Sequence, residues 1–154
     1  MTPKHYWEHK QYLDYLFALG TKFKEGDELL AHYSRYLCVL VSGWLQVAIY
    51  AIYNEYVQKR SSGCVQTYVS KKLKRLYNPS MKNILTLTCE FSSDWMKRLE
   101  GVTVGEIADA INGIVANRNL IAHGQSSDIS YERLKDWYEK AVNGIQLIEE
   151  QCNQ

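Results

Sequence analysis

Apolar residues recur at helical spacing along most of the chain, and this pattern predicts an all-α fold. The longest such segment covers about residues 27–60, and its apolar side chains surround the predicted helix on nearly every side. A helix that is apolar all round is normally a central one. A shorter segment over residues 5–19 is followed by Gly20, a residue that commonly ends a helix.

The most apolar part of the long segment is expected to be a buried helix. It covers residues 39–53, is interrupted by Ser42, Gly43 and Gln46, and is short for a membrane span. The first ten residues, MTPKHYWEHK, lack the apolar core of a signal peptide. We therefore expect no membrane association.

Shorter helices are predicted in the middle of the chain. Residues 65–76 form a basic amphipathic segment with Val65, Val69, Leu73 and Leu76 on its apolar side. Asn78 and Pro79 end this segment. Residues 80–99 hold one helix or two, and a break is expected near Ser92 and Ser93.

Two further helices are predicted in the last third. Thr103 and Glu106 have the spacing of a capping box, which predicts a helix start at this point. This helix is expected to run to His123, where Gly124 ends it. A last helix is expected over about residues 130–150, so the chain predicts an antiparallel bundle of five or six helices.

Composition agrees with a single folded domain over residues 1–154. The chain is 46% hydrophobic and 23% charged, which is usual for a globular protein. Four cysteines, at positions 38, 64, 89 and 152, show no C-x2-C spacing, and three of them lie in apolar surroundings. This usage predicts reduced, buried thiols in a cytoplasmic protein.

The charge is unevenly distributed. The net charge is only +1, yet residues 59–82 hold seven basic residues and no acidic one. Such an asymmetry gives the surface a positive side. Lys71, Lys72, Lys74 and Arg75 could hold RNA phosphates, and a solvated helix face is the alternative.

No metal site or cofactor site is expected from the sequence. His5 and His9 lie four residues apart with Glu8 between them, a spacing that can bind a metal. An exposed helix end near a terminus is the more frequent explanation of such a pair. Neither G-x4-G-K-[ST] nor G-x-G-x-x-G occurs, so a nucleotide-hydrolysing P-loop or a Rossmann fold is not supported.

The stretch RNLIAHG, residues 118–124, combines groups that can cut RNA without a metal. His123 can move a proton near neutral pH. Arg118 can neutralise the charge that develops on a phosphate. RNA supplies its own nucleophile, the 2′-hydroxyl, so the protein needs only a proton acceptor, a proton donor and a cation.

This stretch resembles the R-x4–6-H signature of the HEPN superfamily, and its R-N-hydrophobic-x-x-H-G form looks nearest to RiboL-PSP-like HEPN domains. The resemblance implies a homodimer whose two motif helices face each other across one composite cleft. It implies metal-independent cleavage of RNA to a 2′,3′-cyclic phosphate. Arg118 would stabilise the phosphorane, His123 would transfer protons, and Asn119 would orient the phosphate or the partner motif.

The resemblance also suggests a toxin or phage-defence effector, with an antitoxin or defence-system protein as a possible partner. Two positions depart from patterns in related chains. Gln125 stands where HEPN toxins paired with a nucleotidyltransferase antitoxin often carry Tyr, so modification there is not expected. Gln46 stands about where related chains often place an acidic residue, and an amide cannot act as a base.

Helical geometry restricts how the motif can act. Arg118 continues an apolar stripe formed by Ile107, Ile111 and Ile114, so it must meet a cleft, a partner subunit or a carboxylate. Arg118 and His123 are roughly 140° apart around the helix axis. Either the long Arg side chain reaches the same phosphate, or a second motif comes from another subunit.

A polar line on the long helix is a further candidate. Arg35, Ser42 and Gln46 are spaced seven and four residues apart on an otherwise apolar helix. The line either faces the cleft opposite Arg118 or forms an internal hydrogen-bond network.

The sequence therefore predicts a metal-independent endoribonuclease that acts on RNA as a homodimer. The alternatives are a non-catalytic HEPN-like module that binds RNA, nucleotide or protein, and a structural helical dimer in which Arg118 forms only an interface ion pair.

Overall fold

The computed structural model describes residues 5–154, and these form seven α-helices and no strand. Residues 1–4, which begin the segment searched for a signal peptide, lie outside this range. The helices are α1 (His5–Gly20), α2 (Glu28–Arg60), α3 (Cys64–Leu73), α4 (Met81–Phe91), α5 (Ser93–Thr103), α6 (Glu106–Ala122) and α7 (Tyr131–Cys152). The all-α prediction is confirmed. The predicted count of five or six helices is too low, because the basic segment and both halves of residues 80–99 form separate helices.

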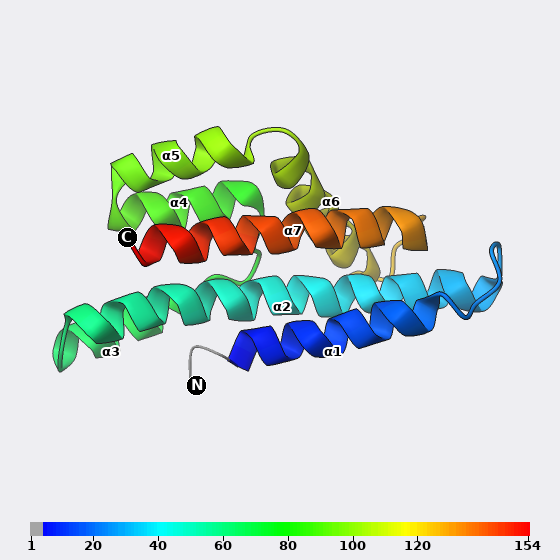
Figure 1. Ribbon diagram of the computed structural model, residues 1–154, viewed down its shortest axis with the longest axis horizontal. Helices are drawn as coiled ribbons and strands as arrows, with labels where there is room; N and C mark the ends of the chain where they lie inside the picture. Colours follow the sequence, from blue (N-terminus) through cyan, green and yellow to red (C-terminus); the bar gives the residue numbers. More distant parts are fainter. Residues whose placement is uncertain (1–4) are drawn as a thin grey trace.

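Helix α2 is the element on which most of the others pack (Figure 1). Helix α1 lies antiparallel along one side of α2, and α7 lies along another side. Helix α6 crosses behind α7 and contacts both α7 and α2. Helices α4 and α5 pair with each other and pack beside α6 and α7, while α3 folds back on the last turns of α2.

The prediction of an antiparallel bundle is wrong for the central pair, because α2 and α7 run in the same direction (Figure 1). Glu28 and Glu132, near the starts of these helices, line one hollow, and Arg60 and Cys152, at their ends, line another. The four helices between them return the chain to the end of the molecule where α2 began. Sequence periodicity fixes the faces of a helix but not its direction relative to a distant helix.

The central role predicted for α2 is confirmed over most of its length. Leu37, Leu45 and Ile49 are fully buried. Two hydrogen bonds join α2 to its neighbours: Trp44 Nε1 donates to the carbonyl of Tyr6 at 2.7 Å, and the hydroxyls of Tyr53 and Thr88 lie 2.6 Å apart. By length and composition α2 could cross a membrane, but 61% of its most apolar window is buried by the rest of the chain. This agrees with its interpretation as a buried helix.

One stripe of α2 is nevertheless uncovered. Leu29, Tyr36 and Val39 are 63%, 49% and 38% exposed. Gly43, one turn after Val39, is also exposed, and a Cβ there would meet no atom within 4 Å. The helix is therefore central on most sides, with an apolar strip of its N-terminal half left at the surface.

Side-chain caps define the starts of several helices. The side chain of Asp27 accepts a hydrogen bond from Leu29 N at the start of α2. The hydroxyl of Ser92 accepts one from Trp95 N and separates α4 from α5, as predicted. Ser130 caps α7 in the same way, at the predicted position.

The predicted capping box at the start of α6 is wrong. Thr103 is the last residue of α5, and its buried hydroxyl donates to the carbonyl of Leu99 at 2.8 Å. Helix α6 begins after Gly105, which makes no side-chain cap and has a φ of +96°. The turn between the two helices needs a positive φ, which glycine adopts readily. The helix therefore begins after Gly105 and not after Thr103.

Helix α6 packs closely on α7 at Gly113, where a methyl group would overlap the indole ring of Trp137. We expect Gly113→Ala to lower the free energy of unfolding by about 1–3 kcal/mol, because the indole or the helix must move. The matched control is Gly101→Ala in α5, where an added methyl meets no atom within 4 Å. That change should raise stability by about 0.5–1 kcal/mol, as expected for alanine in a helix. Urea unfolding measures both, and equal effects would contradict the close packing of α6 on α7.

Candidate functional site at the end of helix α6

Helix α6 ends in a defined turn. The N–H of Gln125 donates to the carbonyl of Leu120 at 2.8 Å, and the N–H of Gly124 donates to that of Ile121 at 3.1 Å. These two bonds form a Schellman motif, with Gly124 at a φ of +68°. The predicted role of Gly124 as the helix stop is confirmed. His123 is the C-cap residue and lies exposed at the rim of the helix end.

The apolar stripe of α6 is satisfied within the chain as far as Arg118. Ile111 and Ile114 are buried against the neighbouring helices, whereas Arg118 is half-buried. Arg118 Nη1 donates to Asn119 Oδ1 at 3.2 Å, and no carboxylate of residues 5–154 forms an ion pair with the guanidinium. Of the three predicted explanations, a carboxylate within this part of the chain is thus excluded. A half-buried cation without a carboxylate is suited to bind an anion.

The bond to Asn119 also decides where the guanidinium lies. Asn119 and His123 are one helical turn apart on the same face, and the carbonyl of Asn119 accepts the N–H of His123 at 3.1 Å. By bonding to the side chain of Asn119, Arg118 brings its guanidinium toward the face that Asn119 and His123 share. The long side chain of Arg118 therefore places its guanidinium closer to the His123 side of the helix than the backbone position of Arg118 alone would.

A part-buried hydrogen bond fixes the loop that follows the motif. Ser127 Oγ donates to Asn117 Oδ1 at 2.8 Å, and Asn117 Nδ2 donates to the carbonyl of Gly113 at 2.8 Å. Ser127 is only 5% exposed. Neither residue was predicted from the sequence, where the only signal was an additional Asn directly before Arg118. We assign both a positioning role, since neither side chain belongs to the motif.

The polar line of α2 lies on the side next to α6. Cys38 Sγ donates to the carbonyl of Ile114 at 3.4 Å, so Cys38 faces α6. Arg35 and Ser42, three and four residues from Cys38, share that side of the helix, and Gln46 follows one turn later. No hydrogen bond joins these three side chains, and Arg35 contacts His32 Nδ1 at 2.6 Å instead. The internal network is therefore not seen, and a position opposite Arg118 stays a prediction.

The predicted basic residues, Lys71, Lys72, Lys74 and Arg75, are all exposed, but they are not beside the motif. Helix α3 docks on α2 through Ser70 Oγ, which donates to Asn54 Oδ1 at 2.7 Å. Helix α6 meets α2 near Cys38 instead. At the rise of an α-helix these two points on α2 are about 24 Å apart. The amphipathic face of α3 is also narrower than predicted, because Leu73 is buried while Val65 is exposed.

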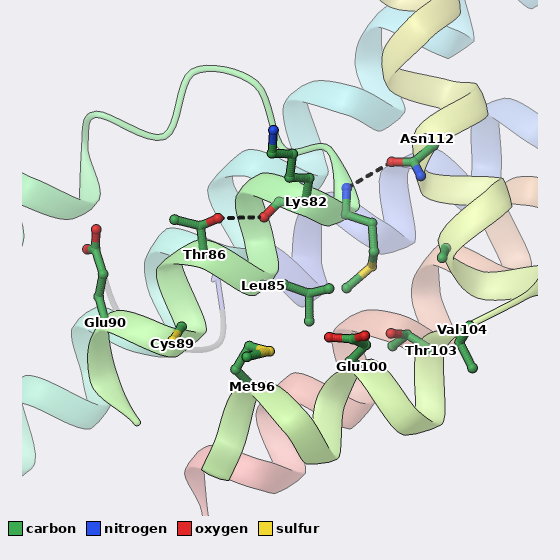
Figure 2. Close-up of a pocket in the computed structure, with 12 residues that line it drawn as sticks. Lys82, Leu85, Thr86, Cys89, Glu90, Met96, Glu100, Thr103, Val104 and Asn112 are labelled. Atoms are coloured by element: carbon green, nitrogen blue, oxygen red, sulfur yellow. Dashed lines mark hydrogen bonds between the residues drawn. The ribbon is translucent and has the colours of Figure 1, made fainter. Parts of the chain in front are cut away.

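A cavity lies elsewhere in the molecule. It measures about 670 Å³, lies between α4, α5 and α6, and contains none of the motif residues. Figure 2 shows Leu85 and Met96 facing into it, and Lys82 and Glu90 also line it. Asn112 Oδ1 accepts the N–H of Met81 at 2.9 Å and holds the start of α4 against α6. The lining is mainly apolar, so this cavity suits an apolar group better than a phosphate.

The cysteines and the His5–His9 pair are the other candidate nucleophiles and metal ligands. Burial raises the pKa of the Cys38 and Cys152 thiols to about 12, which keeps them protonated at neutral pH. Cys64 and Cys89 are exposed, so the expectation of three buried thiols holds for two. The rings of His5 and His9 lie edge to face, and no three potential His, Cys, Asp or Glu ligands gather within residues 5–154.

Comparison with known proteins identifies the family. Residues 66–154, which include α4 to α7 and the motif, match the family model described as RiboL-PSP-HEPN. This is more than half of the chain, so the protein belongs to the RiboL-PSP-HEPN family. No curated protein and no solved structure gives a significant match.

The Asn117–Ser127 bond makes a prediction for the loop after the motif. Ser127→Ala leaves a part-buried amide oxygen without its donor, so the free energy of unfolding should fall by about 1–3 kcal/mol. Amide hydrogen exchange should accelerate over residues 124–128. Ser126→Ala, at the exposed neighbouring position, is the matched control and should change neither quantity. If the two variants behave alike, Ser127 does not hold the loop.

Proposed function

We propose that this protein is a metal-independent endoribonuclease whose active site is formed at the end of α6. The observation that carries the proposal is the state of Arg118. Its half-buried guanidinium has no carboxylate partner within residues 5–154 and is held by Asn119 toward the face of His123. This helix end supplies a cation and one imidazole, two of the three groups that cleavage by the 2′-hydroxyl requires.

The reaction balances with RNA as the only substrate. An imidazole accepts the proton of the 2′-hydroxyl, and the oxygen attacks the adjacent phosphorus. The bond from phosphorus to the 5′-oxygen breaks, and a second imidazole protonates that oxygen. The products are a 2′,3′-cyclic phosphate and a 5′-hydroxyl. Arg118 offsets the added negative charge of the phosphorane, and Asn119 Nδ2 can donate to a non-bridging oxygen because its Oδ1 accepts from Arg118.

The need for both a base and an acid supports a homodimer, since one chain supplies only one motif His. The uncovered stripe of Leu29, Tyr36 and Val39 lies on α2, the helix that α6 contacts. An exposed apolar strip of this kind is suited to burial against another surface. We propose that two chains associate so that their motifs form one composite cleft, with Arg35, Ser42 and Gln46 along its side.

Substrate binding and biological role complete the proposal. Lys71, Lys72, Lys74 and Arg75 would contact the phosphates of RNA away from the cleavage site. We further propose a role as a toxin or phage-defence effector in the cytoplasm, controlled by an antitoxin or another defence protein. The competing function is a non-catalytic module that binds RNA, nucleotide or protein. It is favoured by the amide at Gln46 and by the position of the motif on an open helix end.

A single substitution tests the chemistry. His123→Ala should abolish cleavage of RNA while leaving helicity and melting temperature nearly unchanged, because His123 is exposed. His9→Ala removes another exposed imidazole and should leave cleavage intact. Excess EDTA should not affect the parent protein. Loss of activity in EDTA would contradict the metal-free mechanism, and cleavage by His123→Ala equal to that of His9→Ala would exclude this His from the chemistry.

A mixed dimer tests the composite cleft. Co-expression of parent and His123→Ala chains with different affinity tags allows purification of the heterodimer. If acid and base come from the two subunits, this heterodimer should be as inactive as the His123→Ala homodimer. Retention of half the parent activity would mean that each chain carries a complete site. Sedimentation should show a dimer at tens of micromolar, and a monomer there would contradict the proposed assembly.

A further inference from the structure

Another hollow, of about 480 Å³, lies between the end of α3, the connecting residues and α4. Its volume is within the range of about 300–1,000 Å³ that is usual for ligand pockets. Tyr77 lies on its wall and is 74% exposed, the highest value among the exposed large apolar and aromatic side chains. Basic and amide side chains line the same space, so an aromatic ring and cations occur together.

The cations of this hollow are not equivalent. Lys72 Nζ lies 3.1 Å from Glu90 Oε2 and is therefore neutralised by a carboxylate from α4. Arg75, also on the wall, forms no ion pair with residues 5–154. Arg75 is thus the cation with donors available to a phosphate.

Polar groups on the α4 side keep unused hydrogen-bonding capacity. Asn83 Nδ2 donates to the carbonyl of Asn78 at 2.8 Å, which leaves its second N–H and Asn83 Oδ1 for other partners. Glu90 uses one oxygen for Lys72 and keeps the second. Glu90 borders both this hollow and the apolar cavity of Figure 2. A ligand in this hollow can therefore meet the Tyr77 ring, the Arg75 guanidinium and the carboxylate of Glu90.

We propose that this hollow binds one nucleotide of a single-stranded RNA. The base stacks on Tyr77, the adjoining phosphate binds Arg75, and the edge of the base meets Glu90 and Asn83. Stacking on an exposed aromatic ring beside a basic surface is how proteins hold single strands. The inference rests on the proposed function, since it defines how the substrate of the ribonuclease is held.

The surroundings favour a strand over a free nucleotide. Lys71 and Lys74 continue the positive surface of α3 outside the hollow and are not on its wall. A strand that passes through the hollow brings neighbouring phosphates to these lysines, whereas a mononucleotide has none to offer. The hollow therefore anchors RNA at a point separate from the motif. Helix α3 contacts α2 at Asn54, whereas α6, which carries the motif, contacts α2 at Cys38.

The acceptors also determine a preference among bases. Cytosine presents an amino group where uracil presents a carbonyl, and a carboxylate can accept from the cytosine amino group. Because the free oxygen of Glu90 can only accept, whereas Asn83 can donate or accept, the carboxylate should make cytosine bind more tightly than uracil, a base of the same size.

Binding is measured on the His123→Ala protein in EDTA, by fluorescence anisotropy with labelled oligo(C) and oligo(U) of equal length. Tyr77→Ala should weaken the affinity for oligo(C) about tenfold, and Tyr77→Phe should restore it, because stacking needs the ring and not the hydroxyl. The matched control is Tyr68→Ala, which removes a tyrosine on α3 that is 67% exposed and outside the hollow. Equal effects of Tyr77→Ala and Tyr68→Ala would overturn the proposal.

The phosphate contact has its own readout. Arg75→Ala should reduce the slope of log affinity against log salt by about 0.7, as for one single-strand phosphate contact. Arg98→Ala, an exposed cation on α5, should leave the slope unchanged. An unchanged slope with Arg75→Ala would contradict the proposed contact between Arg75 and a phosphate in the hollow.

Two further binding measurements identify the ligand, one with the Glu90→Gln variant and one with a free nucleotide. Glu90→Gln should reduce the preference for oligo(C) over oligo(U), and an unaltered preference would exclude Glu90 from the base edge. Cytidine monophosphate should bind far more weakly than oligo(C), and equal affinity would assign the hollow to free nucleotides and overturn the assignment to RNA.

These measurements distinguish failure of the proposed nucleotide hollow from failure of the proposed ribonuclease activity. If the parent protein does not cleave RNA but oligo(C) binding depends on Tyr77, the nucleotide hollow stands and the catalytic proposal falls. If the parent cleaves RNA while Tyr77→Ala and Tyr68→Ala bind alike, the catalytic proposal stands and the hollow falls.

Discussion

The close packing of α6 against α7 and α2 is the constraint on which the candidate site depends. Gly113 lets the helix approach the indole of Trp137, and the thiol of Cys38 donates to the backbone of Ile114 on another side. A helix held from two sides cannot rotate or slide without overlap in a tightly packed interior. Its last turn, with Arg118 to His123, is therefore presented at a fixed place.

Hydrogen bonds at the helix end extend this order to the motif. The Schellman turn fixes His123 at the rim, and the bond from Ser127 to Asn117 holds the returning loop. Within this frame, Arg118 lacks a carboxylate among residues 5–154 and bonds to Asn119 instead. Burial makes such a cation costly alone and effective toward an anion. The packing that stabilises the fold thus also fixes the position of the candidate site.

Local signals were sufficient to predict much of this arrangement. The ends of α2, the break at Ser92 and the stop at Gly124 depend on neighbouring residues, and the structure confirms them. The motif itself was recognisable because its residues are close in sequence. The capping box at Thr103 failed because the turn at Gly105 meets tertiary requirements that a four-residue pattern does not include.

Features that join distant segments could not be predicted from the sequence. The parallel course of α2 and α7, the anchor from Ser127 to Asn117, and the distance from the basic helix to the motif all depend on how helices pack. That distance has a functional meaning in our account. It separates the residues that would hold the strand from those that would cut it, so affinity and cleavage can be altered independently.

The chemistry of the cleaved ends is the most direct measurement of the central claim. RNA of defined sequence is incubated with the parent protein in excess EDTA, and the products are identified by mass spectrometry. Attack by the 2′-hydroxyl predicts fragments that end in a 2′,3′-cyclic phosphate and begin with a 5′-hydroxyl. Fragments with a 3′-hydroxyl and a 5′-phosphate, or RNA that remains intact, would contradict the account.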